Sequence, residues 1–330
     1  MKKGILQAGV LAVSFVLMAC DNGMKFDLPQ TSDNFEQNVT YNNKVDIVWM
    51  IDSSSSMSQH QARLNDQIPT LVSTLNALKM DYHMAVVTSS MGGTAEQQTG
   101  GKFVGSPKYV TRSTPNLVNV LKARMLVGES GSNNERGLES VETALSAGYL
   151  NTEGRGFFRD EALLVVIALS DEDDKSKSTS DAAATYYKNF FDSIKRPWVD
   201  GTRSWMFSFI GVLNLSSQCT TFNDYAEPGL AFIKLADASG GVKTSICTNN
   251  LSSAVSGIRA RIFQILTDFK LSKKPDPATI VVKINGQVVP QSSTNGWDYI
   301  EDLNIIRFYG SAVPAADASI KVDFKPKEAN

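Results

Sequence analysis

The chain has 330 residues, of which 42% are hydrophobic and 20% charged, and its net charge is −2. This length accommodates one large domain and one small one, and the composition excludes a disordered or collagen-like chain. The near-balanced charge gives no electrostatic reason to expect nucleic-acid binding.

Residues 1–19 have the pattern of a signal peptide. Lys2 and Lys3 form a basic start, and residues 5–19 are a mostly apolar run, shorter than the roughly 20 residues of a membrane-spanning helix. The run ends in Leu-Met-Ala before Cys20, which resembles the lipobox of bacterial lipoproteins. The resemblance implies acylation of Cys20, with fatty acids such as palmitate, and a lipid anchor in the bacterial cell envelope. The alternative is an ordinary secretory signal with a chance cysteine.

The two remaining cysteines are Cys219 and Cys247. Outside the cytoplasm, two such thiols are expected to form a disulfide. Two free buried cysteines are the alternative.

Residues 20–43 are polar and rich in turn residues, so we interpret them as a tether, with 35–39 able to add a strand to a sheet. The nearly continuous apolar run 45–51 predicts a strand buried on both faces. From Leu64 onward, apolar residues recur at helical spacing, with Pro69 expected to kink the helix. Residues 83–88 predict a second strand, and 92–106 a loop.

The same alternation continues along the chain. Residues 113–115 predict a helix start, 162–169 a buried strand, 182–194 a helix, 205–212 a strand, 230–238 a helix, and 251–269 a long final helix. Strands that alternate with helices predict an α/β fold, an open, mostly parallel, doubly wound sheet with helices on both faces. We assign residues 44–271 to this domain.

Residues 275–327 predict a second, smaller domain. Residues 279–284 alternate as a strand does, and Asn285-Gly286 is a strong two-residue hairpin signal. Further strands are expected at 302–309 and 319–324. We therefore expect a small β-sandwich-like module, near the lower size limit for independent stability.

Oxygen-bearing side chains follow two of the buried strands. Asp52, Ser54 and Ser56 come after the first strand, and Asp171 follows the strand at 162–169. Ligands of open α/β sheets bind at the carboxyl ends of strands, where strand order reverses. Carboxylate and hydroxyl oxygens suit Mg²⁺ or Ca²⁺ better than zinc. A third loop lies between these two strands in the sequence, and Ser132 in that loop offers a further hydroxyl.

This ordered set resembles the metal-ion-dependent adhesion site of von Willebrand factor A (VWA) domains. The resemblance covers about residues 44–270 and implies a von Willebrand factor A fold. It implies that Ser54 and Ser56 contact Mg²⁺ (or Ca²⁺ or Mn²⁺) directly, and that Asp52 and Asp171 act directly or through water. It also implies that an acidic residue of a protein partner takes the open coordination position, and that binding depends on the metal.

The sequence departs from the family in two places. The third-loop residue is usually threonine, whereas the candidates here are Ser132 and Ser130, of which the spacing to Leu138 favours Ser132. The run Glu172, Asp173 and Asp174 replaces the usual residues after the second metal-site aspartate. These acids either hold a second ion or form a solvated loop.

The pattern favours binding over catalysis. The two histidines, His60 and His83, lie in no recognisable nucleophile pattern, and there is no zinc spacing or P-loop. We therefore expect no enzyme activity, and an adhesion or protein-binding role with an extracellular or envelope protein. The alternatives are a periplasmic scaffold or assembly factor for envelope proteins, and a structural domain whose metal site is degenerate.

Overall fold

The computed structural model describes residues 42–94, 97–198, 201–215, 219, 227–315 and 318–327, together with the backbone of 35–40. The expected signal peptide, Cys20 and most of the expected tether lie outside these residues. Within the described ranges, no helix is both long enough and apolar enough to cross a membrane.

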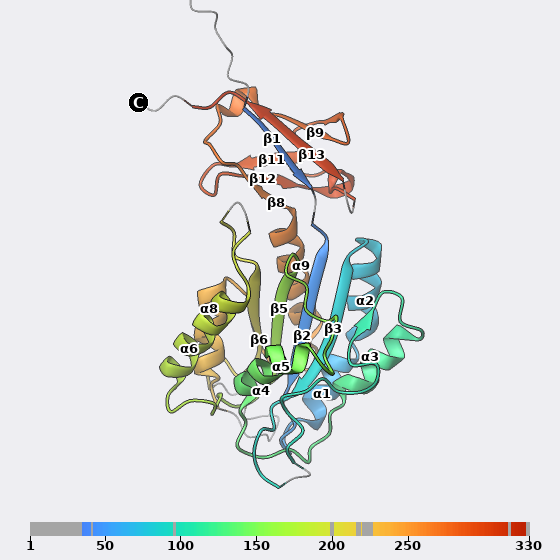
Figure 1. The fold of residues 1–330 in the computed structure, drawn as a ribbon, viewed down its shortest axis with the longest axis vertical. Helices are drawn as coiled ribbons and strands as arrows, with labels where there is room; N and C mark the ends of the chain where they lie inside the picture. Colours follow the sequence, from blue (N-terminus) through green and yellow to red (C-terminus); the bar gives the residue numbers. More distant parts are fainter. Residues whose placement is uncertain are drawn as a thin grey trace, which may run out of the picture. The chain divides into compact units, whose positions relative to one another are not determined.

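Six strands form the central sheet, in the order β4-β3-β2-β5-β6-β7 (Figure 1). β4 runs antiparallel to β3, and the other neighbours are parallel. β2 and β5 are buried on both faces, which explains their mostly apolar sequences. The strands are β2 (Lys44–Ile51), β3 (Asp81–Thr88), β4 (Val110–Thr111), β5 (Leu163–Ser170), β6 (Trp205–Gly211) and β7 (Lys243–Ser245).

Helices cover both faces of this sheet, which confirms the predicted α/β fold class. Alternate residues of a strand face opposite sides, so Trp49 of β2 lies in one core and Val48 in the other. The first core is covered by α1 (Ser58–Asn65), α2 (Ile68–Ala77), α3 (Leu117–Met125) and α9 (Ser252–Thr267). The second is covered by α4 (Gly137–Ala144), α5 (Ala147–Leu150), α6 (Ser180–Ile194) and α8 (Leu230–Ser239).

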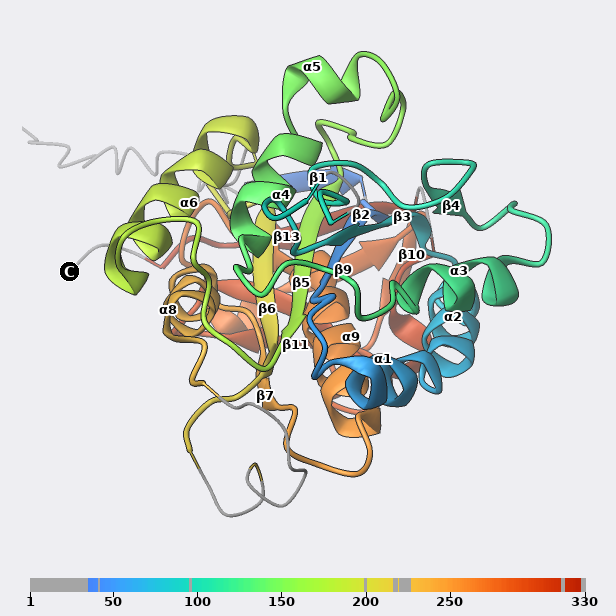
Figure 2. The ribbon, with the colours of Figure 1, turned by 90° about the horizontal axis from the view of Figure 1, so that it is seen from below.

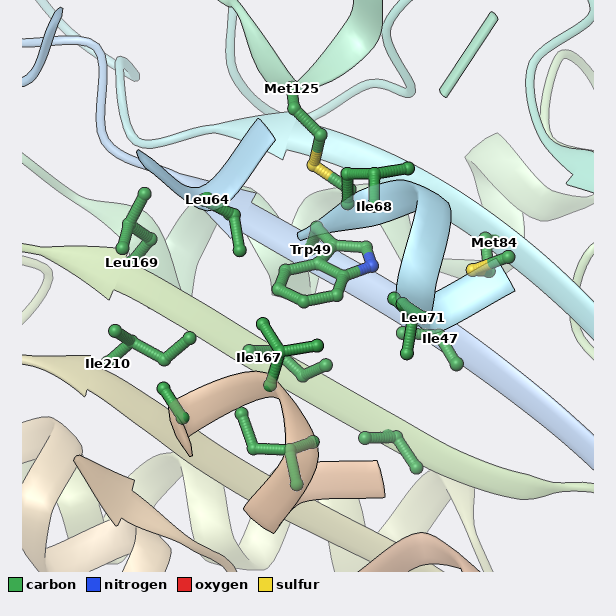
Figure 3. Close-up of a cluster of buried hydrophobic side chains, with 14 of the residues drawn as sticks. Ile47, Trp49, Leu64, Ile68, Leu71, Met84, Met125, Ile167, Leu169 and Ile210 are labelled. Atoms are coloured by element: carbon green, nitrogen blue, oxygen red, sulfur yellow. The ribbon is translucent and has the colours of Figure 1, made fainter. Parts of the chain in front are cut away.

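The first core is densely packed beneath the end of β2. Figure 3 shows Trp49 surrounded by aliphatic side chains that include Leu64 and Ile68. Trp49 is fully buried and lies three residues before Asp52. The candidate site therefore follows a strand held firmly on both faces.

Two helices differ from the sequence expectation. The helix expected from Leu64 is two helices, and Pro69 lies in the first turn of α2, where its missing N–H would have had no helical acceptor anyway. The final helix ends at Thr267 instead of running to Phe269. Phe269 belongs to β8 (Asp268–Lys270), and its ring packs into the core of the small module. A strand thus replaces the last helical turn because its residues find a sheet partner in β12 (Ile305–Phe308).

The small module contains two antiparallel sheets, β1-β13-β9-β10 and β11-β12-β8. β1 (Phe35–Thr40) pairs with β13 (Ser319–Phe324), so the module combines chain segments from before and after the central sheet. Asn285 and Gly286 both have positive φ, as a tight hairpin turn requires. The remaining elements are β9 (Val281–Ile284), β10 (Gln287–Val289), β11 (Trp297–Ile300), η1 (Pro277–Thr279) and η2 (Gly310–Ala312).

Candidate metal-binding site

The candidate site lies at the carboxyl ends of the central strands β2 and β5, the end of the sheet that faces the viewer in Figure 2. β3 flanks β2 on one side and β5 on the other, so strand order reverses here. Ile51 pairs in register with Leu169. Consequently Asp52 and the Ser170-Asp171 pair leave the sheet side by side.

Asp52 is fully buried and firmly oriented. Its backbone N–H donates to the Leu169 carbonyl at 2.9 Å. Its Oδ1 accepts from the Ser54 N–H at 2.9 Å and from the Ser89 hydroxyl at 3.2 Å, and its Oδ2 accepts from the Ser170 hydroxyl at 2.6 Å. Burial raises the pKa of this carboxyl, and the hydrogen bonds from Ser170 and Ser54 act against that rise. Both oxygens of Asp52 therefore already have donors.

Asp171 is the opposite case. It is 1% exposed, and neither carboxylate oxygen accepts a hydrogen bond of normal length and angle from the described residues, the nearby Ser56 hydroxyl included. Burial, and after it the negative charge of Asp52, raises the pKa of Asp171 to about 7, although the nearby Ser56 hydroxyl lowers it. A buried carboxylate without a donor is costly. The two carboxylate oxygens of Asp171 are thus free to accept a hydrogen bond or to bind a cation.

Serine hydroxyls of the first loop lie beside these carboxylates. The Ser54 and Ser56 hydroxyl oxygens are 3.2 Å apart. The Ser53 hydroxyl is buried and has no hydrogen-bond partner within the described ranges. Carboxylate and hydroxyl oxygens in one place are the donor set of a hard divalent cation. The residues present therefore fit such an ion.

The third loop, which joins α3 to α4, reaches the first loop through its backbone. The Gly131 N–H donates to the Ser53 carbonyl at 2.9 Å, and a Cβ on Gly131 would lie 2.2 Å from the Ser53 hydroxyl oxygen. Glycine is therefore required for this approach. Ser132 is buried at 7% exposure, and its hydroxyl accepts from the Asn134 N–H at 3.1 Å, whereas Ser130 is exposed.

A glutamine braces the same two loops. The Gln61 amide nitrogen donates to the Asp52 carbonyl and to the Gly128 carbonyl, each at 2.9 Å. The Gly128 N–H donates back to the Gln61 side chain at 3.2 Å. The sequence offered no sign of this role, because it depends on how α1 faces the third loop.

The acidic run after β5 is used mainly to cap helices. Asp173 accepts from the Ala231 N–H at 2.8 Å in the first turn of α8, and Asp174 accepts from the Leu138 N–H at 2.9 Å in the first turn of α4. Carboxylates are favourable at helix N-termini. Across the described part of the chain, no three His, Cys, Asp or Glu side chains gather as a metal cluster. Asp173 and Asp174 are thus engaged in helix capping, which leaves little of the run for a second ion.

Glu135 is a site residue that the sequence analysis missed. It is 2% exposed and follows Ser132 in the third loop. Burial, and then the charges of Asp52 and Glu172, raise its pKa to about 8. A glutamate in a polar loop reads as solvated, so only the tertiary structure identifies it as buried beside the site.

Cys219 and Cys247 form a disulfide, as predicted, with a Cα–Cα distance of 4.7 Å. Both cysteines are buried against the first core. They join the segment after β6 to the segment between β7 and α9.

Each of the two histidines has a hydrogen-bonding neighbour outside the proposed ligand set. His60 Nδ1 is 2.8 Å from the Arg63 guanidinium, and His83 Nδ1 is 2.7 Å from the Phe157 carbonyl oxygen.

No protein-family model matches the chain, and no curated protein matches its sequence. Among solved structures, it is similar to a von Willebrand factor type A protein from Catenulispora acidiphila (14% identity, TM-score 0.39, covering 90% of this chain and 66% of that one). It is also similar to proximal thread matrix protein 1 from the mussel byssus (15%, 0.42, 72% and 52%). A third similarity is to the pilus adhesin SpaC from Lactobacillus rhamnosus GG (11%, 0.42, 88% and 40%). The chain thus spans between 40% and 66% of the length of these proteins.

Proposed function

We propose that this chain is a metal-dependent adhesion or protein-binding protein, in which a divalent cation bridges to an acidic group of the partner. The proposed ligands are Asp52, Ser54, Ser56, Ser132 and Asp171. Mg²⁺ suits this oxygen set, as do Ca²⁺ and Mn²⁺. When bound, the ion supplies the positive charge to which the partner's carboxylate attaches.

Asp171 carries this proposal. Its two buried oxygens lack donors among the described residues, and the neighbouring Asp52 charge makes its ionised form still less favourable. A cation would satisfy both oxygens and offset the repulsion between the carboxylates. The hydrogen bonds suggest different roles for the two aspartates. Asp171 would contact the ion directly, whereas Asp52, whose oxygens already accept hydrogen bonds, would act through water and orient the first loop through the Ser54 N–H.

We further propose that acylated Cys20 anchors the protein in a bacterial envelope. The sequence of residues 1–20 supports this setting. An adhesin and a periplasmic scaffold differ in where the partner is met. Protease treatment of intact cells should cleave a surface adhesin and spare a scaffold that faces the periplasm.

A capture experiment tests the metal bridge. The immobilised protein is incubated with envelope and extracellular protein fractions in Mg²⁺ or in excess EDTA. We expect partner capture in Mg²⁺, loss of capture in EDTA, and loss of capture by Asp171→Asn. Asp181→Asn is the matched control because Asp181 lies on α6 with a side chain 82% exposed. Equal capture in Mg²⁺ and EDTA would refute the bridge.

A further inference from the structure

A lysine lies against the candidate metal site, held by three oxygen atoms. The Lys175 ammonium is 2.5 Å from a Glu172 carboxylate oxygen, 3.4 Å from a Glu135 carboxylate oxygen and 3.3 Å from the Asn133 carbonyl. The Lys175 backbone N–H also donates to the Glu135 carbonyl at 2.8 Å. These contacts join the loop after β5 to the third loop.

The acids around this ammonium are buried. Glu135 and Glu172 are 2% and 7% exposed, whereas the Lys175 side chain is 38% exposed. One oxygen of Glu135 has no hydrogen-bond partner in the described part of the chain. Two carboxylates and a backbone carbonyl are oxygen ligands that Ca²⁺ accepts. The oxygens of Glu135, Glu172 and the Asn133 carbonyl therefore form a cation site, here called the cradle, and the Lys175 side chain that fills it is partly exposed to solvent.

We propose that the Lys175 ammonium occupies a latent second cation site, in place of a second divalent ion. A covalently attached charge compensates Glu135 and Glu172 at every metal concentration. The third loop, which carries Ser132, would then stay attached to the loop after β5 when divalent metal is scarce. The wild-type protein holds one divalent ion, at the proposed Asp171 site, and removal of the ammonium opens the cradle to another.

The count of one ion in the wild type rests on the proposed function, whereas the opening of the cradle does not. Lys175→Met keeps the length of the side chain and removes its charge. Lys175→Arg keeps the charge. In Lys175→Met/Glu135→Gln the cradle loses one carboxylate, so it should no longer hold a divalent ion.

The test counts Ca²⁺ bound per chain by equilibrium dialysis, using the folded protein at Ca²⁺ concentrations up to about 10 mM. The weakest protein Ca²⁺ sites, those of extracellular modules, bind with Kd of about 10⁻⁴ to 10⁻³ M. We expect one ion for wild type and for Lys175→Arg, two for Lys175→Met, and one for Lys175→Met/Glu135→Gln. An unchanged count in Lys175→Met would overturn the proposal.

Lys175→Met is expected to be less stable than wild type, because the buried Glu135 and Glu172 lose the charge that compensates them. A second measurement therefore follows its thermal unfolding with and without Ca²⁺. Added Ca²⁺ should raise its Tm more than that of Lys175→Met/Glu135→Gln, and equal shifts would again overturn the proposal. Asp171→Asn/Lys175→Met separates the two ideas, since it should bind one ion, at the cradle. If wild type binds none and Lys175→Met binds one, the proposed function fails and the cradle stands.

Discussion

Asp171→Asn is expected to stabilise the metal-free protein although it removes a residue of the candidate site. The pKa of Asp171 is about 7 instead of 3.8. That difference corresponds to about 4 kcal/mol of destabilisation once the carboxyl is ionised in both the folded and the unfolded chain. Asp171→Asn removes this cost, but the buried asparagine amide adds about 1–3 kcal/mol because its own hydrogen bonds are unmet. We therefore expect a net gain of about 2 kcal/mol at pH 8.

The pH dependence has a definite sign. A carboxyl whose pKa is higher in the folded state than in the unfolded state costs nothing below pH 3.8, because it is protonated in both states. The cost grows as pH rises from 3.8 to about 7 and is complete above that. The advantage of Asp171→Asn should thus be full at pH 8 and disappear between about pH 5 and 6, where the ionisation cost equals the cost of the buried amide. Near pH 4 the variant should be the less stable protein, by about 2 kcal/mol.

Urea unfolding in EDTA measures this effect as a higher midpoint with an unchanged slope. Asp181→Asn is the control and should lower the midpoint only slightly, because its ion pair with Lys234 and its place in the first turn of α6 are exposed. In Mg²⁺ at about 100 times Kd, wild type should gain about 2.7 kcal/mol and Asp171→Asn nothing. A variant less stable than wild type in EDTA at pH 8 would show that the Asp171 oxygens already have partners, and would refute the reasoning.

Three further predictions concern the framework around the site. Reduction of the Cys219–Cys247 disulfide, or Cys219→Ser with Cys247→Ser, should lower the free energy of unfolding by about 3.5 kcal/mol, since it frees a closed loop whose ends are 28 residues apart; an unchanged urea midpoint would contradict this. Arg159→Met should cost about 3–5 kcal/mol in the same assay, because it leaves the fully buried Asp46 without the guanidinium 2.8 Å away. Asp46→Asn added to Arg159→Met should recover part of that loss, and no recovery would exclude the unpaired charge as its cause. Gly131→Ala should weaken Mg²⁺ binding at least tenfold, about 1.4 kcal/mol, because its Cβ would displace the third loop from the first; titration calorimetry that gives wild-type affinity would contradict this.

The sequence predicted the fold class and the sheet edge that carries the candidate residues. Mostly apolar strands buried on both faces leave a strong signal, and polar residues that follow two neighbouring strands of this kind meet at one end of the sheet. The sequence therefore predicts that Asp52 and Asp171 are neighbours, and the register of Ile51 with Leu169 brings the two loops together. Phe269 shows the limit of periodicity, since its apolar position suited a helix and the structure uses it in a strand.

Loop contacts could not be predicted because they depend on how separate segments meet. Asp173 and Asp174 lie in an acidic run that reads as a solvated loop, yet each caps a different helix. The pairing of Glu135 with Lys175 joins residues 40 positions apart. Helical or strand periodicity cannot reveal these caps or this ion pair, because the partners are far apart in the sequence.

The central claim is that a divalent ion binds on Asp171, and titration calorimetry with Mg²⁺ and Mn²⁺ tests it most directly. Wild type and Asp181→Asn should each bind one ion per chain, whereas Asp171→Asn should show no binding heat while remaining folded. Equal binding by wild type and Asp171→Asn, or no binding by wild type, would contradict the claim.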